Sequence, residues 1–80
     1  MIKMADSHAV IGMKQTLRAL QAGAVETVYL ADDADEPIRK KLREAARLAG
    51  ATLVRVPTMK ELGASCGIEV GAACCAIVRN

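Results

Sequence analysis

Aromatic side chains are almost absent from this sequence of 80 residues, which has no Phe and no Trp and in which Tyr29 is the only aromatic residue. Their absence argues against the RNA-binding modules that stack bases on aromatic platforms. Hydrophobic residues still make up 52% of the chain, and the abundance of Ala, Val, Leu and Ile indicates close packing of small side chains. A chain of this length has room for one core, so residues 1–80 are expected to form a single domain.

An excess of charge of one sign is also missing, because the formal net charge is only +2. This charge does not require a nucleic-acid partner, and it fits a compact binding site better than a long basic groove. No run approaches the roughly 18 apolar residues of a membrane span, and the first residues lack the apolar centre of a signal peptide. We therefore expect a cytoplasmic protein with no membrane partner.

Cysteine and histidine are scarce, with three Cys and one His. The cysteines are too few and too irregularly spaced for a disulfide framework, and without a CxxC pair a metal site is not expected. Cys74 and Cys75 are adjacent and would face opposite sides of a strand, so we expect the cysteines to be small buried hydrophobic residues. Nucleophile-elbow, P-loop and dinucleotide motifs are missing, and His8 has no evident nucleophile to assist. Neither an enzyme nor a cofactor is predicted.

Short apolar segments alternate with helical patterns along the chain. Strands are predicted at residues 9–11, 25–31, 53–56 and 72–78, with helices between them that stop at Gly23, Gly50 and Gly67. Residues 1–8 are compatible with a short helical turn. The last strand is apolar at every position, which indicates a central strand buried on both faces. This alternation predicts an α/β fold, a three-layer α/β/α sandwich with a small mixed sheet of about four strands.

The most informative segment runs from Ile11 to Leu20, where a glycine separates a strand from a helix. The N-terminus of a helix carries partial positive charge and prefers Asp or Glu, yet Lys14 stands in the first turn and Arg18 follows one turn later. Like charges at this spacing cost about 0.2–0.5 kcal/mol. Free amides beside Gly12 and two cations favour an anion, and nucleic acid is the obvious polyanion. A solvated basic helix face is the alternative.

Two loops carry further signals. Residues 32–37 are acidic and end in a proline, and helix capping by Asp35 explains them more economically than a metal site. Thr58-Met59-Lys60-Glu61 then matches a capping box. Ile68 and Val70 lie in a glycine-flanked loop before the last strand. Their side chains either fold back into the core or form an apolar surface for a partner, and both interpretations stay open.

These segments resemble the kink-turn RNA-binding family of ribosomal proteins, above all its short bacterial YbxF-type members. The resemblance covers nearly the whole chain. It is carried by Ile11-Gly12-x-Lys14-Gln15-Thr16, by Ala31-x-Asp33-Ala34-Asp35, and by Glu61-Leu62-Gly63-Ala64-x-Cys66-Gly67-Ile68-Glu69-Val70-Gly71-Ala72-Ala73.

The resemblance implies where RNA would bind. In that family the glycine-led turn enters the RNA major groove at tandem sheared G·A pairs, and the loop before the last strand packs on a nucleotide flipped out of the kink. The matching residues are Gly12, Met13, Lys14, Gln15 and Arg18 for the turn, Ile68, Glu69 and Val70 for the loop, and Asp35 as an acceptor for the flipped base. Archaeal and eukaryotic members carry Asn-Glu in place of Lys14-Gln15, which leaves affinity and base preference open.

The function expected from this resemblance is recognition of kink-turns by a monomer that stabilises the bent RNA. The implied partner is structured RNA, with the ribosome as a further candidate and no DNA. A structural role in the ribosome through the same surface is one alternative. A protein-interaction module built on Ile68 and Val70 is the other.

Overall fold

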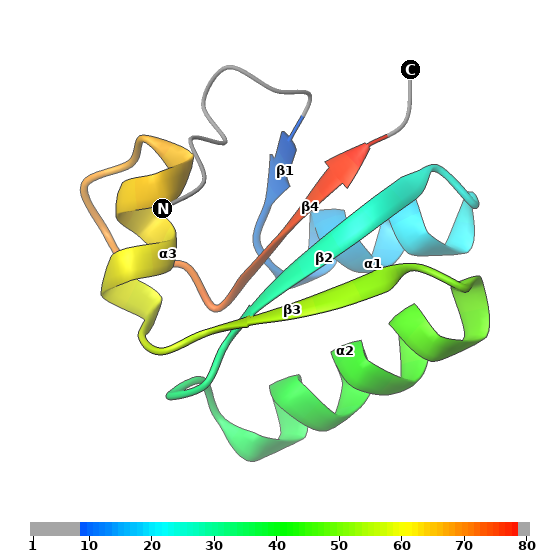
Figure 1. Cartoon of the computed structure of the whole chain (residues 1–80), viewed down its shortest axis with the longest axis horizontal. Helices are drawn as coiled ribbons and strands as arrows, with labels where there is room; N and C mark the ends of the chain where they lie inside the picture. The colour runs from blue at the N-terminus through cyan, green and yellow to red at the C-terminus, as the bar shows by residue number, and fades with distance from the viewer. Residues whose placement is uncertain (1–8, 79–80) are drawn as a thin grey trace.

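The computed structural model describes residues 9–78, so the helical turn predicted at residues 1–8 lies outside the described residues. Helices alternate with strands in this range (Figure 1), in the order that the sequence predicts. The elements are β1 (Ala9–Ile11), α1 (Met13–Gln21), β2 (Val25–Ala31), α2 (Glu36–Ala49), β3 (Thr52–Val56), α3 (Met59–Cys66) and β4 (Cys74–Val78). None of the described helices is long and apolar enough to span a membrane.

The four described strands form one mixed sheet in the order β1-β4-β2-β3. β4 pairs antiparallel with both β1 and β2, whereas β2 pairs parallel with β3. The central position predicted for the last strand is confirmed, although β4 begins at Cys74 and not at Ala72. The N–H of Ala72 donates to the carbonyl of Met59 in α3 at 3.0 Å, which draws this residue away from the sheet.

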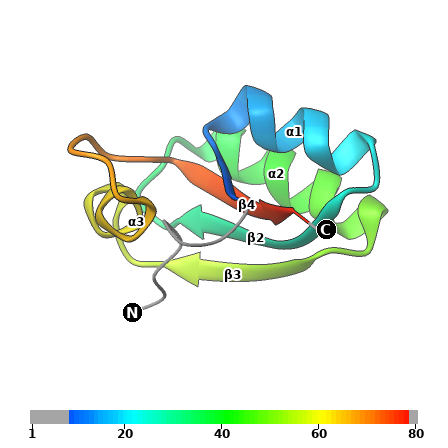
Figure 2. The same cartoon turned by 90° about the horizontal axis from the view of Figure 1, so that it is seen from above.

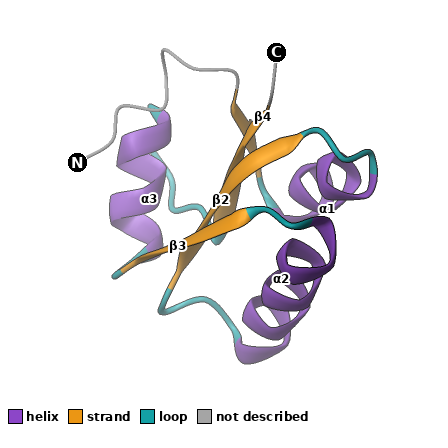
Figure 3. Cartoon of the chain, turned by 45° about the vertical axis from the view of Figure 1, so that its right-hand side comes forward, coloured by secondary structure: helices purple, strands orange, loops and turns teal. Residues whose placement is uncertain are grey.

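α1 and α2 cover one face of the sheet and α3 covers the other (Figure 2 and Figure 3). Side chains alternate along each strand and divide the core accordingly. Tyr29 and Cys75 pack in a cluster with Leu62 of α3, whereas Cys74 packs with Leu42 of α2. The three-layer α/β/α sandwich is therefore confirmed. The prediction that Cys74 and Cys75 face opposite sides of the sheet is confirmed as well.

Local signals set most of the helix boundaries. α2 ends before Gly50 and α3 before Gly67, as predicted, and both glycines adopt the left-handed conformation. Thr58 Oγ1 accepts a hydrogen bond from the N–H of Glu61 at 3.0 Å, which confirms the start of α3 at the capping box.

Asp35 occupies the N-cap position of α2, but its side chain makes no capping hydrogen bond. A capping oxygen normally accepts from the second or third N–H of the helix. The second position here is Pro37, which has no N–H. The N–H of Ile38 at the third position already donates to the main-chain carbonyl of Asp35 at 3.0 Å. The predicted cap position of Asp35 and the place of Pro37 in the first turn are confirmed, but the side chain of Asp35 does not cap the helix, for this geometric reason.

One end of the sheet gathers segments that are far apart in the sequence. Because β1, β2 and β3 run in one direction and β4 runs in the other, the carboxyl ends of the first three strands lie beside the start of β4. Figure 1 shows that the turn into α1, the loop after β2 and the chain entering β4 all lie at this end. The motifs singled out in the sequence therefore meet there.

Candidate nucleic-acid interface

The N-terminus of α1 has no capping side chain and no acidic residue in its first turn. Gly12 at the N-cap position has φ at 95°, a backbone conformation that other residues rarely adopt. Its N–H donates to the carbonyl of Cys74 at 3.0 Å, and its own carbonyl accepts from the N–H of Thr16 at 3.0 Å. The turn is thus fixed to the start of β4, and the partial positive charge of the helix start is left for an anion.

Lys14, Gln15 and Arg18 expose their side chains on α1. Neither cation forms an ion pair with any residue in the described range 9–78. Two cations and one amide therefore stand near the start of the helix without a partner among residues 9–78. This arrangement suits contacts with phosphates and with the polar edges of bases.

Thr16 and Met13 hold the first turn of α1 in place from below. The Thr16 side chain is fully buried, and its Oγ1 accepts a long hydrogen bond of 3.8 Å from the Cys74 thiol. Met13 is half-buried and packs against the cluster that contains Leu30, Leu42 and Cys74. The side chain of Met13 is therefore engaged largely by the core. Thr16 stands in the first motif quoted from the sequence, but only the packing identifies it as a positioning residue.

The loop before β4 lies along α3 and is fastened to it at both ends. The N–H of Ile68 donates to the carbonyl of Gly63 at 3.1 Å, and the N–H of Ala72 donates to the carbonyl of Met59 at 3.0 Å. A Cβ at Gly63 would lie 2.1 Å from the Val70 carbonyl oxygen, and one at Gly71 would lie 3.1 Å from the Cβ of Met59. The close approach of loop and helix thus requires a glycine at residue 63, a role that no local sequence signal indicates.

The side chains of this loop differ in burial, which resolves the two interpretations left open by the sequence. Ile68 is half-buried and packs against the cluster beneath α3. Val70 is 70% exposed, and Glu69 between them is exposed as well. Ile68 thus contributes to both core and surface, whereas Val70 belongs to the surface alone.

The carboxylates of the acidic loop after β2 differ in their hydrogen-bond partners. Asp32 accepts a hydrogen bond from Arg55 at 2.8 Å, and Asp33 accepts one from the N–H of Met59 at 2.8 Å. Asp33 therefore ties this loop to the start of α3. Asp35 is exposed and its carboxylate has no hydrogen-bond partner among residues 9–78. Within that same range no three His, Cys, Asp or Glu side chains are grouped as they would be around a metal ion.

The cysteines lie beneath this surface and take no part in it. Cys66, Cys74 and Cys75 form no disulfide and all are buried, as predicted from the sequence. Burial raises the pKa of the Cys74 and Cys75 thiols above the ordinary range. Neutral, shielded thiols are poor nucleophiles and poor metal ligands, which supports a structural role.

The residues that the resemblance assigns to RNA binding are all exposed or half-buried. The turn at Gly12 and the loop ending at Ala73 are neighbours through the bond from Gly12 to Cys74. The Ala73 carbonyl also accepts from the N–H of Ala31 at 2.9 Å, which joins the loop to the end of β2 that leads to Asp35. The three quoted motifs therefore form one continuous hydrogen-bonded framework.

Comparison with known proteins gives this chain close relatives. An RNA-binding protein of Caldanaerobacter subterraneus subsp. tengcongensis is 46% identical over 78 residues, which are 98% of this chain and 95% of the relative. The RNA-binding protein YbxF of Geobacillus stearothermophilus is 50% identical over 70 residues, 88% of this chain and 85% of the relative. Among solved structures, the Giardia lamblia 15.5kD RNA binding protein has a TM-score of 0.82 at 25% identity, and the match covers 91% of this chain and 62% of that one.

A family profile also matches this chain, over residues 2–80. Together with the YbxF relative, this match confirms the resemblance noted in the sequence. The family and these relatives are non-enzymatic, in agreement with the sequence-based prediction for this chain. The chain belongs to the ribosomal protein L7Ae/L30e/S12e/Gadd45 family.

Proposed function

We propose that this chain binds RNA, recognises kink-turns and stabilises their bent form. The contact surface is the turn into α1, the loop before β4 and Asp35, which together form the candidate nucleic-acid interface. A kink-turn carries tandem sheared G·A pairs beside a bulge. The observation that carries this function is the uncapped start of α1, where Lys14 and Gln15 are exposed above an anchored Gly12. Relatives that are RNA-binding proteins by name support it.

The first turn of α1 reads the G·A pairs. Gly12 lets the backbone approach, because it carries no Cβ and the space that a Cβ would occupy has no other atom within 4 Å. The Gln15 amide accepts from guanine N–H groups through its oxygen and donates through its nitrogen. Lys14 and Arg18 contact phosphates or guanine acceptors, and the amides at the helix start hold a phosphate.

The loop before β4 covers the nucleotide that leaves the kink. Val70, at 70% exposed, supplies most of the free apolar surface, and Ile68 adds the part of its side chain that the core leaves open. Asp35 accepts a hydrogen bond from the flipped base, for which its unengaged carboxylate is suited. A structured-RNA ligand is in keeping with a cytoplasmic monomer, and ribosomal RNA is one source of such structure.

Replacement of the G·A pairs tests this function. Two RNAs are compared, one with a three-nucleotide bulge followed by tandem G·A pairs and one with Watson–Crick pairs in their place. The chain should bind the first more than about tenfold more tightly, a difference of about 1.4 kcal/mol. Equal affinity for the two RNAs would leave only generic attraction of basic residues to RNA.

Two substitutions in α1 separate base contacts from phosphate contacts. Gln15→Ala should cost roughly 1–3 kcal/mol and reduce the preference for G·A pairs, by analogy with base contacts in DNA. Lys14→Ala should weaken the binding of both RNAs alike and reduce the slope of log K against log salt by about one unit. Gln21→Ala, an exposed glutamine at the other end of α1, is the matched control and should change neither.

A further inference from the structure

A second basic site lies between α2 and the edge strand β3. It is a pocket of about 190 Å³ lined by Leu30, Asp32, Arg39, Arg43, Leu53 and Arg55. Its lining thus combines two apolar side chains with three guanidinium groups and one carboxylate. None of these residues belongs to the candidate nucleic-acid interface.

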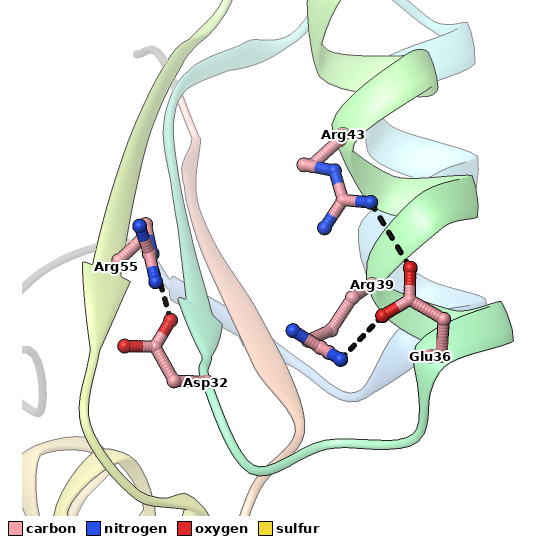
Figure 4. A network of polar contacts seen from close by, with 5 residues as sticks. All are labelled: Asp32, Glu36, Arg39, Arg43 and Arg55. Carbon is pink, nitrogen blue, oxygen red and sulfur yellow. Dashed lines mark hydrogen bonds and ion pairs between the residues drawn. The ribbon is translucent and has the colours of Figure 1, made fainter.

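The arginines are held in place by carboxylates that use only part of their hydrogen-bonding capacity. Figure 4 shows Arg39 and Arg43 extending from α2 toward the strands, with Glu36 bonded to both. Arg55 donates through Nε to Asp32 at 2.8 Å. A guanidinium has five N–H donors, so each of the three retains donors that no described carboxylate uses.

The charge of the pocket favours an anion. Three cations stand against two carboxylates, because Asp32 lines the pocket and Glu36 pairs with Arg39 and Arg43 from outside the lining. One positive charge therefore remains in excess. Arg47 on the same helix forms an ordinary surface ion pair for comparison, because it bonds to Glu44 and does not line this pocket. The convergence of arginines from α2 and β3 therefore exceeds what a solvated helix face requires.

We propose that this pocket binds a phosphate group. Planar guanidinium forks match phosphate oxygens in pairs. The volume is below the roughly 300–1,000 Å³ typical of sites for drug-sized ligands, which fits one phosphate better than a whole nucleotide. The phosphate comes either from the backbone of a bound RNA or from free phosphate, and both offer the same oxygens to the arginines.

The position of the pocket connects it to a bound RNA. Arg39 and Arg43 lie one and two turns along α2 from Asp35. Asp32 lies at the end of β2 that adjoins the candidate interface, where its N–H donates to the carbonyl of Val56 at 2.7 Å. An RNA seated at Asp35 thus has its backbone within reach of this side of the molecule. The assignment of the phosphate to an RNA backbone rests on the proposed RNA binding but not on kink-turn recognition.

Salt dependence measures the RNA contact. The dissociation constant of the kink-turn RNA is followed against salt concentration for the parent chain, for the double variant Arg39→Gln/Arg43→Gln and for Arg47→Gln as the matched control. The double variant should lose about one phosphate contact, which reduces the slope of log K against log salt by about 0.9, whereas Arg47→Gln should keep the parent slope. Arg43→Gln alone is the second variant, because this side chain is more exposed than that of Arg39 and its loss disturbs packing less.

Titration with inorganic phosphate, without RNA, decides the site itself. The Nε–H resonances of Arg39 and Arg55 should shift on titration in the parent chain and in Arg47→Gln. In the double variant, which keeps Arg55 but not Arg39, the Arg55 resonance should not shift. If the parent chain binds phosphate but the double variant keeps the parent's salt slope for RNA binding, the pocket is a site for free phosphate. Loss of neither property in the double variant would overturn the phosphate site. A parent chain that binds no RNA but still binds phosphate would remove the proposed function and leave the pocket standing.

Discussion

Val70 and Leu48 are the large hydrophobic side chains that the described structure leaves most exposed, at 70% and 73%. Val70 stands on the loop before β4, whereas Leu48 lies near the end of α2 that points away from this interface. Both side chains are aliphatic and similarly exposed, which makes them a natural pair for comparison. Only Val70 is expected to cover a flipped nucleotide.

Val70→Asp should therefore reduce RNA affinity by more than about tenfold. It removes apolar cover and sets a carboxylate near the negatively charged RNA backbone. Thermal stability should change little, because exposed substitutions usually stay within about 0.5 kcal/mol. Leu48→Asp should leave both quantities near their parent values. Equal losses of affinity in the two variants would show that the loop is not part of the interface.

Ile68 shows what sequence could not decide at the scale of a residue. A half-buried side chain gives no distinct pattern in a short glycine-flanked loop, and the packing of Ile68 depends on α3 and the sheet together. The roles of Thr16 and Gly63 could not be predicted either, because each depends on a partner elsewhere in the chain. Thr16 bonds to Cys74, which is 58 residues away, and Gly63 packs against Val70, which is 7 residues away. Lys14 and Arg18 stood out because a cation at a helix start breaks a local rule.

At the scale of elements, α3 and the loop before β4 act as one unit. Gly63→Ala in an ordinary helix interior would stabilise by about 1 kcal/mol. Here the added methyl would lie 2.1 Å from the Val70 carbonyl oxygen, so backbone must move. We expect a loss of about 1–3 kcal/mol in the free energy of unfolding and a weaker RNA complex, because the loop is displaced.

Gly23→Ala is the control for this element, measured by denaturant unfolding and RNA titration alongside Gly63→Ala. Its methyl would meet nothing within 4 Å, but φ is 70°, so a strain of about 1–2 kcal/mol is expected. RNA affinity should stay at the parent value because Gly23 lies at the far end of α1. A Gly63→Ala variant that binds RNA as the parent does would disprove the coupling between helix and loop.

The elements themselves were largely predictable, because local physical chemistry determines them. Gly50 and Gly67 end helices through their left-handed conformation, and Thr58 starts α3 through its hydroxyl. Two details were not predictable. The start of β4 is shifted because α3 holds Ala72, and the side chain of Asp35 does not cap α2 because the second helix position is a proline. Prediction from sequence thus fails where a tertiary contact competes with a local preference.

For the whole molecule, the buried thiols make stability depend on alkaline pH. Burial raises the pKa of Cys74 and Cys75, so these thiols stay protonated in the fold. Unfolded thiols ionise above about pH 8.5. The unfolded state then binds fewer protons, so the free energy of unfolding falls as the pH rises. Burial also raises the pKa of Tyr29, which adds a loss of the same sign at higher pH.

Urea unfolding between pH 7 and pH 10 measures this dependence. The parent chain should be nearly constant in stability below about pH 8 and lose stability above about pH 8.5. Cys74→Ala/Cys75→Ala should be less stable at pH 7 through lost packing, but its stability should fall less steeply with pH. RNA affinity at pH 7 should be nearly unchanged. A double variant with the same alkaline slope as the parent would show that these thiols are not the titrating groups.

The bend of the RNA tests kink-turn recognition most directly. Donor and acceptor dyes are placed on the two stem ends of a kink-turn RNA, and energy transfer is measured in buffer without divalent ions, where the RNA is extended. Addition of the protein should bring the stem ends together and raise the transfer efficiency, because binding selects the bent form. The RNA with Watson–Crick pairs in place of the G·A pairs should show no rise. Binding that leaves the transfer efficiency of the kink-turn RNA unchanged, or an equal rise with both RNAs, would contradict recognition of the kink.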